Sequence, residues 1–86
     1  MTYTIVYADS VVRRDIPALP KKQKLQIKRA IEERLTADPI GLGKPLRYSL
    51  MGCRRLRVGD WRIIYRITGR IVQIIKIGNR KEVYEK

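Results

Sequence analysis

Residues 53–84 read CRRLRVGDWRIIYRITGRIVQIIKIGNRKEVY, and they carry the clearest structural signal in the chain. Apolar, β-branched and aromatic residues alternate with arginines, which is typical of strands that bury only one face of an antiparallel sheet. The dipeptides Gly59-Asp60 and Thr68-Gly69 are signals for two-residue turns. The stretch therefore predicts a meander of three strands, at residues 54–58, 61–67 and 70–77.

The period of two along each strand sorts the side chains onto two faces, and two-residue turns set the register. Arg57 then faces Arg62 in the first strand pair, and Tyr65 faces Val72 in the second. One face is almost wholly apolar and must pack on helices: Leu56, Val58, Trp61, Ile63, Tyr65, Ile67, Val72 and Ile74. The other, which we name the open face, carries Arg55, Arg57, Arg62, Ile64, Arg66, Gln73 and Ile75.

The part of the chain before the meander predicts a strand and two helices. Residues 2–7 are β-branched and aromatic, as in a strand. Asp9 or Ser10 is placed to cap a helix that Pro17 and Pro20 keep short. A second helix follows over residues 21–36, since apolar residues recur on one side of it: Leu25, Ile27, Ala30, Ile31 and Leu35.

Asp38-Pro39 ends the second helix. Residues 40–52 contain three glycines and Pro45, so we expect mostly loop, with a short edge strand at 44–47. The prediction is one α+β domain over residues 1–86, in which a small antiparallel sheet packs on an α-helical hairpin. The sheet comprises the N-terminal strand and the C-terminal meander.

The net charge of +12 is unevenly distributed along the 86 residues. Residues 1–43 carry 8 basic and 5 acidic side chains, whereas residues 44–86 carry 12 basic and 3 acidic ones. Directly opposed like charges destabilise a strand pair. An arginine-rich sheet face therefore indicates an anionic partner, and RNA is the first candidate.

Composition excludes several classes of site. Cys53 is the single cysteine and there is no histidine, so a disulfide framework, a thiolate metal cluster and a histidine acid–base pair are excluded, and no metal or cofactor is expected. GLGKP at 41–45 lacks the spacing of a phosphate-binding loop. The start of the chain lacks signal-peptide features and no run is long enough to span a membrane, so we expect a cytoplasmic protein without membrane contact.

Arginine is the residue type best suited to binding the phosphates of RNA, because its planar guanidinium group bonds two phosphate oxygens at once and stays charged. Arg80 follows the last strand closely enough to reach the open face. Tyr84 either packs at the rim of the sheet or serves a base as a stacking platform, or accepts a proton with a pKa lowered by arginines. The alternative for the arginines of the open face is that their charged ends only extend into water and bind no ligand.

LRVGDWRIIYRI followed by IIKIGNRKEVY resembles the RelE family of bacterial type II toxins, within the RelE/ParE superfamily. The likeness covers nearly the whole chain. It implies a toxin that enters the ribosomal A site and cleaves mRNA there, through attack of a 2′-hydroxyl on the neighbouring phosphate. It also implies a cognate antitoxin whose acidic segment wraps the toxin, with operator DNA bound only through the antitoxin complex.

The resemblance assigns roles to residues that match the family motif. Arg62 holds the scissile phosphate, Arg80 stabilises charge in the transition state, and Tyr84 stacks on a base or helps to activate the hydroxyl. The RNA-binding set is Arg54, Arg55, Arg57, Lys76 and Lys81. Arg55 and Arg57 stand where the family often has lysines, and Asn79 stands where many relatives have a histidine.

Two other functions remain open from the sequence. A ParE-like toxin shares the fold but inhibits DNA gyrase by binding, without RNA chemistry. A basic RNA-binding module without activity would use the same arginines for affinity alone.

Overall fold

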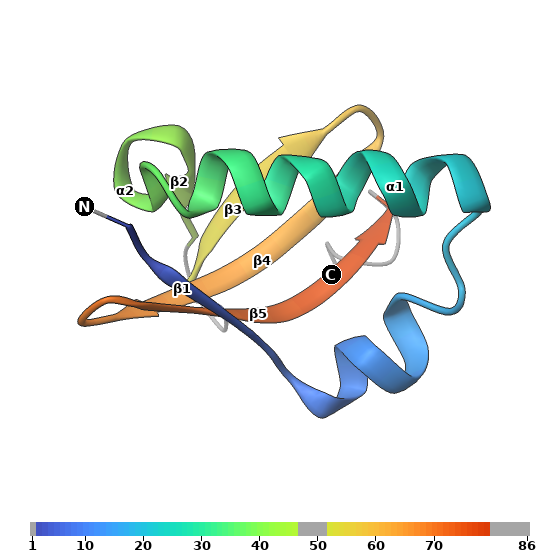
Figure 1. Ribbon diagram of the computed structural model, residues 1–86, viewed down its shortest axis with the longest axis horizontal. Helices are drawn as coiled ribbons and strands as arrows, with labels where there is room; N and C mark the ends of the chain where they lie inside the picture. The colour runs from blue at the N-terminus through green and yellow to red at the C-terminus, as the bar shows by residue number, and fades with distance from the viewer. Residues whose placement is uncertain (1, 47–51, 80–86) are drawn as a thin grey trace.

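The computed structural model describes residues 2–46 and 52–79, which form one sheet with helices against one of its faces (Figure 1). The strand order is β1-β5-β4-β3-β2. The strands are β1 (Thr4–Tyr7), β2 (Lys44–Pro45), β3 (Arg54–Val58), β4 (Trp61–Thr68) and β5 (Ile71–Asn79). The helices are η1 (Val11–Asp15), α1 (Lys21–Ala30), η2 (Ile31–Leu35) and α2 (Pro39–Leu42).

The predicted α+β class is confirmed, with one difference in the sheet. The meander and β2 pair antiparallel, but β1 pairs with β5 in parallel, with Thr4 opposite Ile71 and Tyr7 opposite Ile74. A parallel pair needs a long crossover connection. The helices and the other strands, which lie between β1 and β5 in the chain, supply it.

The short first helix is a π-turn that needs no side-chain cap. The Ile16 N–H donates to the Val11 carbonyl at 2.8 Å, five residues back. The prediction of Ser10 as the cap is wrong, because Ser10 already has helical dihedrals and makes no capping hydrogen bond, and Asp9 is likewise already inside the helical segment. An N-cap residue needs extended dihedrals to turn its side chain onto the first free N–H groups.

The second helix begins after Pro20, as predicted, and runs through α1 into the π-helical turn η2. Ile27, Ile31 and Leu35 are buried, but the prediction for Leu25 is wrong, since 61% of its surface is exposed. Leu25 precedes Ile27 by two residues, which turns it to the far side of the helix.

Part of the segment predicted as loop is also helical. Asp38 accepts a hydrogen bond from the Gly41 N–H at 2.9 Å and so caps α2, with Pro39 at the first helical position. The expected edge strand is β2, which covers Lys44–Pro45 within the described residues.

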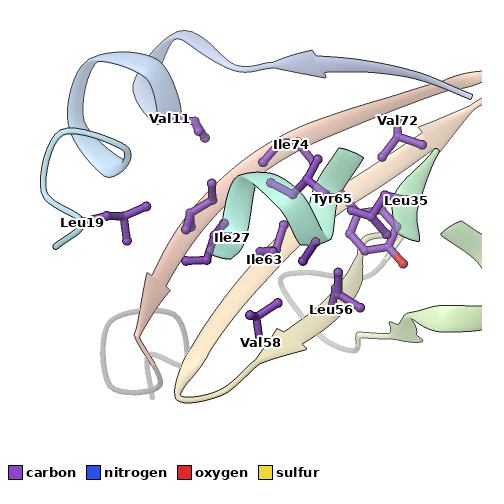
Figure 2. Close-up of a cluster of buried hydrophobic side chains, with 13 residues drawn as sticks. Val11, Leu19, Ile27, Leu35, Leu56, Val58, Ile63, Tyr65, Val72 and Ile74 are labelled. Atoms are coloured by element: carbon purple, nitrogen blue, oxygen red, sulfur yellow. The ribbon is translucent and has the colours of Figure 1, made fainter. Parts of the chain in front are cut away.

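The core lies between the helices and the apolar face of the sheet (Figure 2). Every meander residue predicted for this face belongs to it or packs against it, with Trp61 and Ile67 only partly buried. The Tyr65 hydroxyl donates to the Pro39 carbonyl at 2.6 Å, so the ring's polar end is satisfied inside the core. Tyr65 thereby fixes α2 to β4.

The first hairpin has the predicted register and the second does not. Arg57 lies opposite Arg62 and Val58 opposite Trp61, across the Gly59-Asp60 turn. The second turn is Gly69-Arg70, so that Thr68 pairs with Ile71. Gly69 has a φ of +59°, which glycine adopts readily, whereas the β-branched Thr68 fits a strand better.

A β-bulge interrupts the pairing of β4 with β5. Ile64 pairs with Lys76 and Tyr65 with Ile74, which leaves Ile75 as the extra residue. The bulge reverses the alternation along β5. Beyond it, Ile77 joins the core, and Lys76 turns to the open face.

Candidate nucleic-acid interface

Basic side chains form two adjacent rows across the open face. The first row runs through Lys44, Arg55, Ile64 and Lys76, one residue from each of β2, β3, β4 and β5. The second row is Arg57, Arg62 and Gly78. The rows hold five cations and no carboxylate, so their charge favours a bound anion.

Arg62 lies at the centre of the second row, and the prediction that it is exposed is wrong. Only 6% of its surface is accessible. Its Nη1 donates to the Trp61 carbonyl at 3.2 Å and to the Gly59 carbonyl at 3.3 Å, so the guanidinium is folded back onto the turn. Alternation along a strand gives the face of a residue but not the path of a long side chain, so sequence reasoning missed this burial.

The burial of Arg62 changes its electrostatics. A charge with little water around it acts on nearby anions through a lower effective dielectric constant than an exposed charge does. Hydrogen bonds to two carbonyls also fix the guanidinium in advance. Arg57, directly opposite, is exposed and donates from Nε to the same Gly59 carbonyl at 3.3 Å.

The two lysines of the first row, Lys44 and Lys76, lie far apart in the sequence. Lys76 was predicted among the RNA-binding residues, and the bulge at Ile75 places it on the open face. Lys44 was not predicted for the site. The predicted edge strand at 44–47 could have indicated Lys44, because any strand beside residues 54–58 puts one of its side chains opposite Arg55.

Arg54 lies apart from the other candidates. It is paired with Tyr65, on the face that bears the core, and its Nη2 donates to the carbonyls of Ile40 at 2.6 Å and Gly43 at 3.0 Å. Arg54 was predicted among the RNA-binding residues, but the geometry separates it from Arg55 and Arg57. Adjacent residues of a strand point to opposite faces, and Arg54 ties the α2 segment to β3.

The open face also has an apolar part, which contains Ile64 on the predicted face. Ile64 and Cys53 are buried there, with Leu46 and Ile75 packed against them. Arg66, further along β4, points a guanidinium nitrogen at the Cys53 sulfur from 3.7 Å. This small cluster includes Ile64 of the first row, so it divides the cations of that row, whereas Arg57 and Arg62 of the second row are direct neighbours.

Arg80, Lys81 and Tyr84 lie outside the described residues. The last described residue, Asn79, pairs with Trp61 at the end of β5, next to the pair of Arg62 with Gly78. Within residues 2–46 and 52–79, no cluster of carboxylate, cysteine or histidine side chains has a metal-binding arrangement. In the same ranges, no helix is long and apolar enough to cross a membrane.

Comparison with known proteins places this geometry in a family. Residues 5–84 match the family model described as ParE toxin of type II toxin–antitoxin system, parDE. Toxin RelG of Mycobacterium tuberculosis is 31% identical over 88 residues, with all of both chains covered. Toxin RelE of the same organism is 37% identical over 73 residues, covering 83% of this chain and 75% of that toxin.

A solved structure agrees with these relatives. The toxin–antitoxin complex RelBE2 from Mycobacterium tuberculosis contains a chain with a TM-score of 0.86 and 30% identity. The match covers 93% of this chain and all of that one. With the family model spanning most of the sequence, this protein belongs to the RelE/ParE superfamily, as a RelE-family toxin of type II toxin–antitoxin systems.

Proposed function

We propose that this toxin is a ribosome-dependent mRNA endonuclease that cleaves mRNA in the ribosomal A site and so inhibits translation. The observation that carries the proposal is the second row of the open face, where the buried, carbonyl-held Arg62 faces Arg57. A fixed pair of guanidinium groups suits a phosphodiester, whose charge increases in the transition state.

The proposed reaction is internal transfer of the phosphate. The RNA 2′-oxygen forms a bond to the adjacent phosphorus while the bond to the 5′-oxygen breaks, which leaves a 2′,3′-cyclic phosphate and a free 5′-hydroxyl. The 2′-hydroxyl loses a proton and the departing oxygen gains one. Arg62 stabilises the extra negative charge on the phosphate oxygens, and Arg57 binds the same phosphate from the neighbouring strand.

Residues beyond Asn79 complete the proposal. Arg80 follows the strand that ends beside Arg62, and we assign it charge stabilisation at the same phosphate. Tyr84 stacks on a base or takes part in proton transfer, and Lys81 contributes to RNA binding. Arginine is a poor proton carrier at neutral pH, and the chain has no histidine. In this proposal the ribosome holds the mRNA in the reactive geometry and so compensates for the lack of an efficient general base in the toxin.

We also propose that a RelB-type antitoxin with an acidic segment holds the protein inactive. The support is the +12 charge and the 30% identical relative, whose structure is a toxin–antitoxin complex. In this proposal ribosomal RNA and the antitoxin are alternative partners, and operator DNA is bound through the antitoxin. A cytoplasmic location follows from these partners.

Primer extension on an mRNA translated in a purified system tests the activity, with the same RNA untranslated beside it. Cuts in register with codons, on the translated message only, are expected. Arg62→Ala should lower the cleavage rate by about 10²–10³, the usual effect of removing one preorganised donor to a developing oxyanion. Arg66→Ala removes the same charge from the same strand and should leave the rate nearly unchanged.

Because Arg62 is buried, its alanine variant is checked for folding by circular dichroism. Arg62→Lys keeps the charge but loses the planar fork, and it should also cleave slowly. Full activity in a folded Arg62→Lys and Arg62→Ala pair would contradict the assigned role.

Gyrase inhibition is the second candidate, because the matching family model is described as a ParE toxin. In that case RNA stays intact in both reactions, and the protein inhibits gyrase in a DNA supercoiling assay. A protein that binds RNA but inhibits neither process would instead be a non-catalytic RNA-binding module.

A further inference from the structure

A basic depression of about 340 Å³ lies at the β2 side of β3, next to the site proposed above. We name it the cation pocket, and it is lined by Arg34, Leu42, Lys44, Arg55, Leu56 and Arg57. Of these six residues, the ones that line the pocket within the described parts of the chain, four are basic and none is acidic. Neither Arg34 nor Lys44 has a role in the function proposed so far.

The fold brings these cations together from three separate segments. Arg34 lies on η2, Lys44 opens β2, and Arg55 and Arg57 belong to β3. The pairing of β2 with β3 begins at Lys44, opposite Arg55, so no residue of β2 is paired with Arg57. The depression lies beside this first residue of β2, with Leu42 and Leu56 as its apolar part.

Two of the cations that line the pocket lie directly opposite each other on neighbouring strands. Lys44 and Arg55 are directly opposed like charges on paired strands, and such pairs are destabilising. Arg34, Lys44 and Arg57 are exposed, so a ligand can reach them. A hollow lined by one sign of charge concentrates the field and raises the local concentration of anions.

The pocket is continuous with the candidate site, since Arg57 lines the pocket and also faces Arg62. An occupant of both places must carry negative charges at intervals, as the backbone of a nucleic acid does. We propose that the cation pocket binds a second backbone phosphate of the same RNA strand, next to the scissile one. Arg34 and Lys44 are then RNA-binding residues; this inference rests on the proposed function.

Binding of an RNA oligonucleotide with 2′-deoxyribose at the attacking position tests the proposal without cleavage. Fluorescence anisotropy gives its affinity for the free toxin as a function of salt concentration. Arg34→Gln and Lys44→Gln should each weaken binding to all sequences alike. The affinity falls as salt is added, so the slope of log K against log[salt] is negative. Each variant should make this slope less steep by about 0.7, the value for one single-strand phosphate contact.

Lys28→Gln is the matched control, because Lys28 is an exposed cation of α1 that does not line the cation pocket. It should leave the slope unchanged. Equal slopes for all three variants would overturn the inference. So would variants at Arg34 and Lys44 that lose binding to a polyglutamate peptide while they bind RNA normally, because the pocket would then belong to an acidic protein segment.

Translation-coupled cleavage by the wild-type protein is measured alongside. A wild-type toxin that cuts no mRNA, but shows the expected slope changes, contradicts the proposed function and supports the second phosphate site. Normal cleavage with unchanged slopes contradicts the second phosphate site alone.

Discussion

Gly43→Ala is expected to destabilise the fold by forcing the chain at residue 43 away from the buried ring of Tyr65. A Cβ at this position would lie 1.8 Å from the Tyr65 hydroxyl oxygen, 2.8 Å from its Cζ and 3.0 Å from the Arg55 carbonyl oxygen. Tyr65 is fully buried and its hydroxyl is bonded to Pro39 at 2.6 Å, so the ring has little room to move away.

The magnitude follows from two contributions. Overpacking of a core costs about 1–3 kcal/mol. Movement of the ring also breaks the hydrogen bond to Pro39, which adds about 1 kcal/mol. The Gly43→Ala variant should therefore lose about 2–4 kcal/mol of unfolding free energy, by the sum of these ranges. A domain of this size loses about 4–8 °C in Tm per kcal/mol.

A double-mutant cycle with Tyr65→Phe isolates the contact. Tyr65→Phe alone leaves the Pro39 carbonyl without its donor and costs about 1–3 kcal/mol. In the double variant the hydroxyl that makes the shortest contact is absent, and its hydrogen bond cannot be lost twice. The double variant should therefore be more stable than the sum of the single changes by at least about 1 kcal/mol, within the usual range of coupling between contacting residues.

Urea unfolding followed by Trp61 fluorescence measures the three variants. Gly41→Ala is the control, since its Cβ would meet the side chain of the exposed Asp38 at 2.3 Å, and that side chain can rotate away by giving up its hydrogen bond to the Gly41 N–H, which costs about 0.5–2 kcal/mol. Gly41→Ala should cost less and add independently to Tyr65→Phe. Additivity of Gly43→Ala and Tyr65→Phe to within about 0.5 kcal/mol would refute the steric argument.

Three further outcomes are expected. Burial raises the pKa of Tyr65 above 10.0, with Asp38 adding to the rise and Arg54 opposing it. The tyrosine of the unfolded chain therefore ionises first as the pH rises, so the unfolding free energy should be at its full value below pH 10 and fall above it. Urea unfolding at several pH values should show this fall, and it should be less steep in Tyr65→Phe. The Asp15 carboxylate accepts a hydrogen bond from the Ile77 N–H at 2.9 Å, so Asp15→Ala should lower the unfolding free energy by about 1–3 kcal/mol, and Asp15→Asn by less, in thermal unfolding. Equal losses in the two variants would show that this hydrogen bond is not the cause. Leu25→Gln should change stability by less than about 0.5 kcal/mol, and a core-sized loss in urea unfolding would place Leu25 in a contact.

Some features of the fold were predictable because they depend on neighbours in the chain. The register of Arg57 opposite Arg62 follows from one two-residue turn, whose geometry the Gly59-Asp60 dipeptide specifies. The same holds for the helix that begins after Pro20. Family membership was also predictable, because the motif around Arg62 is contiguous.

Site residues were predicted less completely. Arg55, Arg57 and Lys76 do lie on the open face, but the side of Lys76 depends on a bulge that no local signal announced. Arg54 was grouped with its neighbours although it points to the other face and binds the α2 segment. Roles for Arg80, Lys81 and Tyr84 stay predictions, since these residues lie outside the described ranges.

The α+β class, the two faces of the meander and the basic character of one of them could be inferred from the order of the residues. These features follow from residue periodicity and short turns, which act over a few residues. The parallel pairing of β1 with β5, the burial of Arg62 and the approach of Arg34 and Lys44 to β3 became known from the folded chain alone. Those features depend on contacts between residues far apart in the chain, for which alternation along a single strand carries no information.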